Sequence, residues 1–384
     1  MTKKILIIGG AGFIGQSLSR SLLRQGVLVR ILDNFNAQVH ISGCLSSDLD
    51  GNVELLKGDL RDRELMRQAL NGVEVVVHLA AETGTGQSMY EIDRYFSINC
   101  QGTATMLDLL QNEGCGASIR SIVVASSRAV YGEGAYRCDS HGVVFPNQRE
   151  REFMSQGHFD PICPICRGSI SLLPTQEAAP FNPMSIYGLT KQVQEQAVLL
   201  FARTHGINGF GLRYQNVYGP GQSLKNPYTG ILAVFSNLAR QNQPIEIYED
   251  GLESRDFVYI DDVVSATKCC INYQGKFVGP LNVGSGVATT VMAVAQEVKA
   301  FFGSESAISV TGAFRMGDIR HNISDLKNLE KILGFKPAVT FKEGLTNFLV
   351  WAASQATPED KLAYLRSVDQ LTARGLMGKY LPRI

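Results

Sequence analysis

The sequence lacks the features that would direct it to a membrane, the secretory route or a nucleic acid. No run of apolar residues is long enough to span a bilayer. The first apolar run, Ile5–Ile8, is too short for a signal-peptide core and is followed at once by glycines. Lys plus Arg and Asp plus Glu number 36 each, so no overall basic field exists to attract polyanions. We therefore expect a cytoplasmic protein with no nucleic-acid or membrane partner, which holds any anionic ligand with local groups.

Charged residues are also scarce, at 19%, whereas 45% of residues are hydrophobic. This composition excludes a disordered chain, and 384 residues suit two lobes. The eight cysteines come without a secretion signal, which argues against a disulfide framework. Most of them are expected to be small buried hydrophobic residues.

Short apolar runs alternate with amphipathic stretches in the first half of the chain. Such alternation, with unbroken apolar strands, predicts an α/β fold with a Rossmann-type doubly wound parallel sheet. The rhythm breaks at residues 133–180, which are rich in Pro, Cys, Gly and charge and are expected to form an insertion. The predicted domains are a sheet domain of residues 1–132 and 181–219, this insertion, and a smaller mixed α/β lobe of residues 220–384, parts of which return to the sheet domain.

A glycine-rich turn follows the first predicted strand and opens the first predicted helix. It reads Gly9-Gly10-Ala11-Gly12-Phe13-Ile14-Gly15. Glycines permit the sharp turn, and backbone N–H groups at a helix start can then approach a pyrophosphate. Asp33 ends the second strand, where a carboxylate binds ribose hydroxyls and repels a 2′-phosphate, so NAD is favoured over NADP. The alternatives are a plain tight turn and an ordinary strand-end acid, and Asp59 is a weaker candidate for an adenine contact.

Tyr187 and Lys191 are four residues apart, so on a helix they share a face. A nearby ammonium lowers the pKa of a phenol, which makes Tyr187 a candidate acid and base. Ser127 follows the strand Ile122–Ala125, at the edge where parallel sheets bind ligands. Alone, these residues could equally be a surface Tyr/Lys pair and a capping hydroxyl.

Taken in order along the chain, these motifs resemble the extended short-chain dehydrogenase/reductase family, in its nucleotide-sugar epimerase/dehydratase branch. The resemblance also includes His78-Leu79-Ala80-Ala81 and Asn99 with Gly102-Thr103, and extends from Lys4 to about Phe348. It implies that Ser127 hydrogen-bonds the sugar hydroxyl being oxidised, that Tyr187 moves its proton and that Lys191 holds the nicotinamide ribose. It also implies a homodimer. The cofactor residues that it implies are Gly9, Gly12, Phe13, Ile14, Gly15, Asp33, Asn34, Asp59, Leu60, Leu79, Ala80, Ala81, Asn99, Tyr187 and Lys191.

Three further segments resemble the parts of this family that hold the nucleotide sugar. Asn216 matches a residue that contacts the diphosphate, and Arg255 and Arg315 match its two phosphate-binding arginines. Guanidinium groups bind oxyanions bidentately, which suits a diphosphate. Thr83 is expected to flank both cofactor and sugar. Without the resemblance, surface ion pairing is the simpler reading of either arginine.

The residues after Ser127 depart from part of the family. Sugar 4,6-dehydratases carry an Asp-Glu pair where this chain has Arg128 and Ala129, and related decarboxylases use a Glu at the second position. What remains is the equipment of an NAD-dependent 4-epimerase. A net nucleotide-sugar dehydrogenase or reductase is an alternative, whereas the intact Ser127, Tyr187 and Lys191 set argues against a non-catalytic NAD-binding protein.

The insertion carries Cys138 and His141, then Cys163 and Cys166. Two such pairs predict a tetrahedral zinc site, structural because four protein ligands leave no open position, and His158 offers a substitute ligand. The alternative is a set of reduced, unligated cysteines. The insertion and the segment Glu82–Ser88 resemble the subgroup of dTDP-L-rhamnose 4-epimerases, which make dTDP-6-deoxy-L-talose. UDP-glucose is the alternative substrate.

Overall fold

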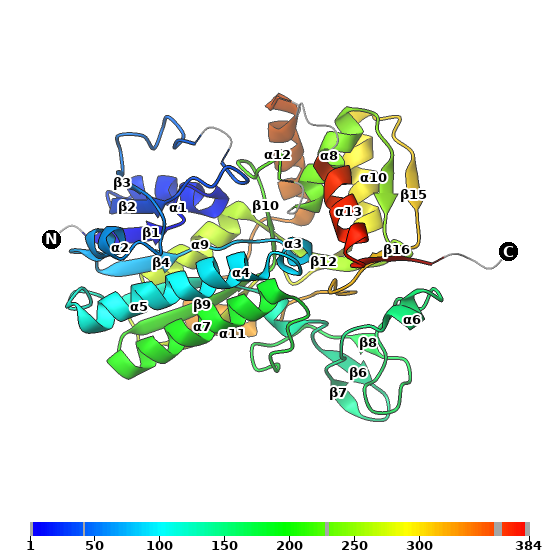
Figure 1. Cartoon of the computed structure of the whole chain (residues 1–384), viewed down its shortest axis with the longest axis horizontal. Coiled ribbons are helices and arrows are strands. Elements are labelled where there is room, and N and C mark those ends of the chain that lie inside the picture. Colours follow the sequence, from blue (N-terminus) through cyan, green and yellow to red (C-terminus); the bar gives the residue numbers. More distant parts are fainter. Residues whose placement is uncertain (1–2, 41–42, 227–229, 357–362, 381–384) are drawn as a thin grey trace.

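A seven-stranded sheet in which every strand runs parallel to its neighbours organises the fold. The computed structural model describes residues 3–40, 43–226, 230–356 and 363–380 (Figure 1). The order of strands across the sheet is β13 (Val278–Val283), β9 (Asn208–Tyr214), β5 (Ser121–Ser127), β4 (Val75–His78), β1 (Lys4–Ile8), β2 (Leu28–Asp33) and β3 (Glu54–Lys57). The predicted Rossmann-type doubly wound sheet is therefore confirmed.

Both faces of the sheet are buried, because successive side chains of a strand point to opposite faces and each face is covered by helices. In β1, Ile5 and Ile7 belong to one buried cluster, and Leu6 and Ile8 belong to the other. The first cluster is covered by α1 (Phe13–Leu23) and α9 (Ile260–Ile271), and the second by α2 (Arg63–Leu70), α5 (Gly102–Asn112) and α7 (Ile186–His205).

The chain reverses its direction across the sheet between β1 and β4. At such a switch point a crevice opens beyond the carboxyl ends of the strands, where open α/β sheets bind ligands. Ile8, His78 and Ser127 end β1, β4 and β5, so the glycine turn starts from the same edge of the sheet at which Ser127 lies.

A second lobe lies beside this edge (Figure 1). Its core is continuous with one buried face of the large sheet, through side chains such as Phe235, Val294 and Phe348. Its strands are β10 (Asn216–Tyr218), β11 (Ile245–Ile247), β12 (Ser254–Tyr259), β14 (Ala288–Thr290), β15 (Ile308–Val310), β16 (Ala313–Arg315) and β17 (Met377–Lys379). Its helices are α8 (Ile231–Arg240), α10 (Val291–Phe302), α12 (Phe341–Ser354) and α13 (Ala363–Ala373). Helix α11 (Lys327–Leu333) packs against β13 of the large sheet. Within the described residues, no helix is both long and apolar enough to cross a bilayer.

The insertion forms a small unit of its own at the lower right of Figure 1. Three short antiparallel strands, β6 (Tyr136–Cys138), β7 (Gly142–Val144) and β8 (Ser171–Leu172), make a sheet, and α6 (Arg151–Met154) lies between β7 and β8 in the chain. Only four buried residues form its own apolar cluster: Tyr136, Cys138, Val144 and Cys163. The apolar content of this unit is therefore low.

Candidate active site

The glycine turn brings the start of α1 close to the ends of β1 and β4. Gly9 has φ +80°, and a Cβ atom there would lie 2.6 Å from the backbone nitrogen of Ala80. A Cβ atom on Gly15 would lie 2.6 Å from the carbonyl oxygen of Gly10. Larger residues at these two positions would push the helix away from the turn. The turn therefore brings the amino end of α1, whose first N–H groups have no partner within the helix, to the carboxyl ends of the strands, where a phosphate can bind as the sequence predicts.

Asp33 ties the glycine turn to the end of β2. Its buried carboxylate accepts hydrogen bonds from the backbone N–H groups of Ala11, at 3.0 Å, and Phe35, at 2.8 Å. The imidazole of His40 lies 3.4 Å from the same carboxylate. His40 could not be predicted as a site residue, because it lies in a loop whose sequence has no periodic pattern.

A cavity of about 460 Å³ runs along this edge of the sheet. Its volume falls in the range of small-ligand sites. Asp59, Asn99 and Lys191 are predicted cofactor residues whose side chains do not line it. The predicted residues that do line it are Gly9, Gly12, Phe13, Ile14, Gly15, Asp33, Asn34, Leu60, Leu79, Ala80, Ala81, Thr83, Ser127, Tyr187 and Asn216.

The side chains of Asp59 and Asn99 bind other groups of the protein and do not face the cavity. The carboxylate of Asp59 pairs with Arg61, whose hydrogen bonds lower the pKa of Asp59. Asn99 lies in a π-helical segment, Phe96–Gln101, and its side-chain oxygen accepts from the backbone N–H of Glu82 at 2.8 Å. Its amide nitrogen donates to the hydroxyl of Thr190 at 2.9 Å. Asn99 therefore links helix α7 to the part of the cavity wall that contains Thr83.

Ser127 and Tyr187 meet in the cavity wall. Ser127 ends β5, and Tyr187 stands in the first turn of α7, which Ser185 caps by accepting from the N–H of Gly188. Both side chains line the cavity, and Ser127 is close enough to Tyr187 to affect the pKa of its phenol. Gly188 allows this approach, because a Cβ atom there would lie 2.6 Å from the carbonyl oxygen of Ala129. The structure thus brings the predicted hydroxyl and phenol together.

The cation that affects the pKa of Tyr187 is Arg128, not Lys191 as predicted. Burial raises the pKa of Tyr187, while the hydrogen bond from Ser127 and the positive charge of Arg128 oppose the rise. Lys191 was expected to lower this pKa, but its ammonium donates to the carbonyl oxygen of Ala125, at 2.8 Å, and to Gln194, at 2.9 Å. Burial also lowers the pKa of Lys191 to about 7.

A buried polar network that the sequence did not indicate fixes Lys191. Gln194 accepts from Lys191 and donates to the hydroxyl of Thr103 at 3.0 Å. That hydroxyl also lies 2.9 Å from His78, whose pKa burial lowers to about 3. Lys191 and Gln194 are neighbours on one helix, but His78 and Thr103 are far from them in the sequence, and no spacing rule joins these parts. The hydrogen bonds between them connect the end of β4 to helix α7 and favour one geometry, while Nδ1 of His78 has no partner among the described residues.

A second cavity, of about 200 Å³, adjoins the first on the side of the second lobe. Arg128 and Asn216 line both cavities, and Arg255 and Arg315 line the second. Arg255 is held by backbone carbonyl oxygens of Ser254, Ile319 and Arg320, at 2.8 to 3.0 Å. The structure therefore gathers all three predicted diphosphate residues around one cavity next to Ser127 and Tyr187.

Several buried polar atoms in these cavity walls have no hydrogen-bond partner among the described residues. They are Asn216 Oδ1, Gln222 Oε1 and Ser223 Oγ. Buried polar groups are normally satisfied, so such atoms fit a polar ligand. Together with the glycine turn and Asp33, they show that the residues present fit a dinucleotide in the first cavity.

The four predicted metal ligands lie together in the insertion and line neither cavity. The sulfur atoms of Cys138, Cys163 and Cys166 and a ring nitrogen of His141 all lie within 4.8 Å of one another. No disulfide joins any of the cysteines in the part of the chain that the structure describes. His158, the substitute ligand, lies outside this group and packs against Phe153.

Comparison with known proteins agrees with this geometry. The chain matches the NAD dependent epimerase/dehydratase family over residues 5–150 and 168–284. It is 37% identical to the dTDP-L-rhamnose 4-epimerase of Burkholderia thailandensis over 356 residues, which cover 92% of this chain and 96% of that protein. It resembles the structure of MoeE5 in complex with UDP-glucuronic acid and NAD, with TM-score 0.73, 26% identity and coverage of 91% of this chain and 99% of that one.

The UDP-glucose 4-epimerase of Thermotoga maritima, solved with UDP-glucose, is similar at TM-score 0.72 and 27% identity over 91% of this chain and 98% of that one. Epimerases are isomerases, so two of these three relatives are enzymes of that class. The family match covers more than half of the chain and confirms the predicted resemblance. The chain belongs to the NAD-dependent epimerase/dehydratase family.

Proposed function

We propose that this protein is an NAD-dependent nucleotide-sugar 4-epimerase. One observation carries the proposal: Ser127 and Tyr187 both line the dinucleotide cavity, which adjoins the cavity of Arg255 and Arg315. A sugar with its diphosphate on the arginines would reach these two hydroxyl groups. Arg128 and Ala129 offer no acid and base pair for the removal of water, so oxidation and re-reduction at one carbon remain.

Each proposed step uses a residue of this chain. Tyr187 takes the proton of the sugar C4 hydroxyl, and Ser127 hydrogen-bonds the same oxygen and keeps it in position. NAD, held by the glycine turn and Asp33, would supply the hydride chemistry at C4. The 4-keto sugar rotates within the site while Asn216, Arg255 and Arg315 retain the diphosphate. Tyr187 returns the proton to the C4 oxygen after hydride has been added to the opposite face of C4. C4 is inverted, and the net redox change is zero.

We propose dTDP-L-rhamnose as the substrate and dTDP-6-deoxy-L-talose as the product. Support comes from the relative of Burkholderia thailandensis, which is named for this substrate. UDP-glucose is the second candidate, favoured by the similarity to the epimerase solved with that sugar nucleotide. The two candidates share the C4 chemistry but differ in the nucleoside and in the sugar, which is a 6-deoxy-L-hexose in one and D-glucose in the other.

Incubation with each sugar nucleotide, followed by NMR of the C4 configuration, tests the proposal. We expect inversion of dTDP-L-rhamnose, no accumulation of NADH and no product from the Tyr187→Phe variant. Inversion of UDP-glucose alone would keep the reaction and overturn the substrate. A 4-keto-6-deoxy sugar formed from a hexose would show a dehydratase, and NADH released with each turnover would show a dehydrogenase.

We also propose that the protein forms a homodimer through α7. Leu189, Val193 and Leu200 are exposed on this helix, and Leu200 is 62% exposed, although water-facing helix positions are usually polar. Light scattering should give twice the chain mass, and Leu200→Asp should shift the protein towards a monomer. Leu28→Asp, at a 50% exposed position on β2, is the matched control and should stay dimeric. A monomeric parent protein at micromolar concentration would overturn the proposal.

A further inference from the structure

We infer that the insertion holds a structural zinc ion, bound by Cys138, His141, Cys163 and Cys166. None of the four residues lines the cavities used by the proposed reaction. The family match includes Cys138 and His141 but omits residues 151–167, so Cys163 and Cys166 are no part of the matched family pattern. Thiolates and imidazole are preferred zinc ligands, and four of them close the coordination shell.

The spacing of the ligand atoms fits a tetrahedron around zinc. With Zn–S bonds of about 2.3 Å and a Zn–N bond of about 2.0 Å, sulfur atoms lie about 3.8 Å apart and sulfur and nitrogen about 3.5 Å apart. The Cys138 and Cys166 sulfurs are 3.7 Å apart. The Nδ1 atom of His141 lies 3.5 Å from the sulfur of Cys138 and 3.6 Å from that of Cys163. Three separate edges therefore have the length that one zinc ion requires.

A disulfide does not account for the arrangement. Bonded sulfur atoms lie about 2.05 Å apart, well under the 3.7 Å between Cys138 and Cys166. A disulfide would also leave the third thiol and the imidazole unexplained. Two sides of the ligand set are exposed, His141 and Cys166, while Cys138 and Cys163 are buried. An ion can therefore enter from solvent and still be held by the inner pair.

The backbone around Cys163 is already folded as a metal-binding turn. The N–H of Arg167 donates to the carbonyl oxygen of Cys163, and the N–H of Cys163 donates to that of Gly168, both at 2.9 Å. Arg167 has φ +60°, a left-handed conformation that is unfavourable for a non-glycine residue. The buried apolar side chains of the unit fall into two small clusters, one with Tyr136 and Val144 and one with Met154 and Phe159, so a bound ion would add stability that no large core supplies.

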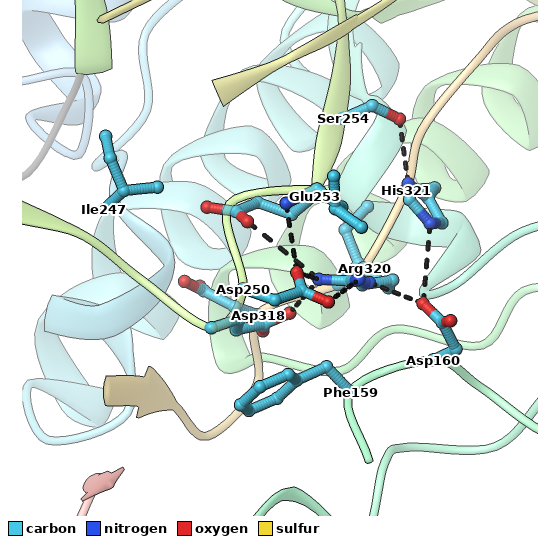
Figure 2. Close-up of polar contacts among 12 residues, drawn as sticks. Phe159, Asp160, Ile247, Asp250, Glu253, Ser254, Asp318, Arg320 and His321 are labelled. Atoms are coloured by element: carbon cyan, nitrogen blue, oxygen red, sulfur yellow. Dashed lines mark hydrogen bonds and ion pairs between the residues drawn. The ribbon is translucent and has the colours of Figure 1, made fainter. Parts of the chain in front are cut away.

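The insertion also holds the segment on which Arg255 rests. Glu133 accepts from the backbone N–H of Arg320 at 2.8 Å, and Arg149 donates to the carbonyl oxygen of Asp318 at 2.9 Å. Asp160, three residues before Cys163, binds the buried guanidinium of Arg320 at 2.7 Å. Figure 2 shows Arg320 between Asp160 and Asp250, with the ring of Phe159 below it.

This contact gives the ion a positioning role. Arg255 donates to the carbonyl oxygens of Ile319 and Arg320, so loosening of the chain around Asp160 would loosen the support of a diphosphate-binding side chain. Loss of the ion should then raise the KM for the nucleotide sugar by about tenfold, and kcat should change little. This consequence rests on the proposed function, whereas the ion itself does not.

Metal analysis of protein purified without added metal and without chelators is the test. We expect about one zinc per chain in the parent protein and in Cys115→Ser, and less than about a tenth in Cys163→Ser. Cys115 is the matched control, because it is half-buried in the sheet domain, outside the ligand group. The fold of each variant is checked by circular dichroism and by NAD binding.

A second measurement needs no variant. Removal of zinc from the parent protein by a chelator should make residues 133–180 sensitive to protease, and added zinc should reverse this. Less than about a tenth of an equivalent of metal in the parent protein overturns the inference, as does iron in place of zinc or a Cys138–Cys166 disulfide found by mass spectrometry. An unchanged KM after zinc removal overturns the positioning role alone. A failure of the epimerase assay leaves the metal result standing.

Discussion

Replacement of Gly188 by Ala should impair catalysis without removing any functional group. An added Cβ atom would lie 2.6 Å from the carbonyl oxygen of Ala129, about 0.8 Å short of ordinary van der Waals contact. The blocking atom belongs to the backbone of the 3₁₀ turn Arg128–Tyr131, which directly follows Ser127, so helix and turn must move apart. Overpacking of this kind costs about 1–3 kcal/mol of stability. A shift approaching 1 Å between Tyr187 and Ser127 would reduce kcat by roughly 100-fold.

Gly206→Ala is the matched control for this variant. Gly206 ends the same helix with φ +64°, and nothing lies within 4 Å of a Cβ atom there. Alanine in this left-handed conformation costs about 1–2 kcal/mol, but the strain arises at the far end of α7. Urea unfolding and steady-state epimerisation should therefore show two destabilised proteins, of which only Gly188→Ala has lost activity. Equal losses of kcat in both variants, or full activity in Gly188→Ala, would refute the reasoning.

Three further outcomes follow from the site. Tyr187→Phe should lower kcat by about 10²–10⁴-fold and leave the NAD content of the purified protein unchanged, because only proton transfer is lost; turnover assays and cofactor analysis check this. Asp33→Ser should weaken NAD binding and allow NADP to bind, as calorimetric titration would show, since the carboxylate that repels a 2′-phosphate is removed. His78 stays neutral in the folded protein down to its pKa of about 3, whereas an unfolded histidine is protonated below about pH 6.5. The unfolded state therefore binds more protons between these values, and stability falls by about 1.4 kcal/mol per pH unit as the pH drops through them. His78→Gln should reduce that slope in urea unfolding at pH 7 and pH 5.

The sheet and the glycine turn could be predicted because their signals are local. Continuous apolar runs such as Ile5–Ile8 are explained by burial on both faces, and the glycines by the close approach of Gly9 to Ala80. Ser127 and Tyr187 could be found only together with the family pattern, since a hydroxyl after a strand and a tyrosine in a helix are each common.

The electrostatics around these residues could not be predicted from spacing. A four-residue interval places Lys191 on the face of α7 that carries Tyr187, but it does not say where a long side chain turns. Gln194 and the carbonyl oxygen of Ala125 accept hydrogen bonds from the ammonium. The carbonyl oxygen of Ala125 reaches it only because α7 packs against β5. The same limit hid the buried pair of Glu195 and Arg213, which are 18 residues apart and meet at 2.6 Å.

Arg128 joins these observations, because it departs from the dehydratase pattern and lines both cavities. Within the described residues no ion pair neutralises its guanidinium, and burial together with the charge of Arg255 lowers its pKa to about 10. Arg128 and Arg255 are two positive charges that lie close together and away from water, which is unfavourable while the site is empty. A doubly charged anion bound between them would relieve this repulsion. The charge of Arg128 opposes the rise that burial causes in the pKa of Tyr187, and in the proposed reaction this favours the phenolate that takes the proton of the C4 hydroxyl group. A guanidinium cannot act as the base that removal of water requires. If the proposed reaction is right, the side chain that follows Ser127 therefore favours anion binding and this proton transfer, and disfavours elimination.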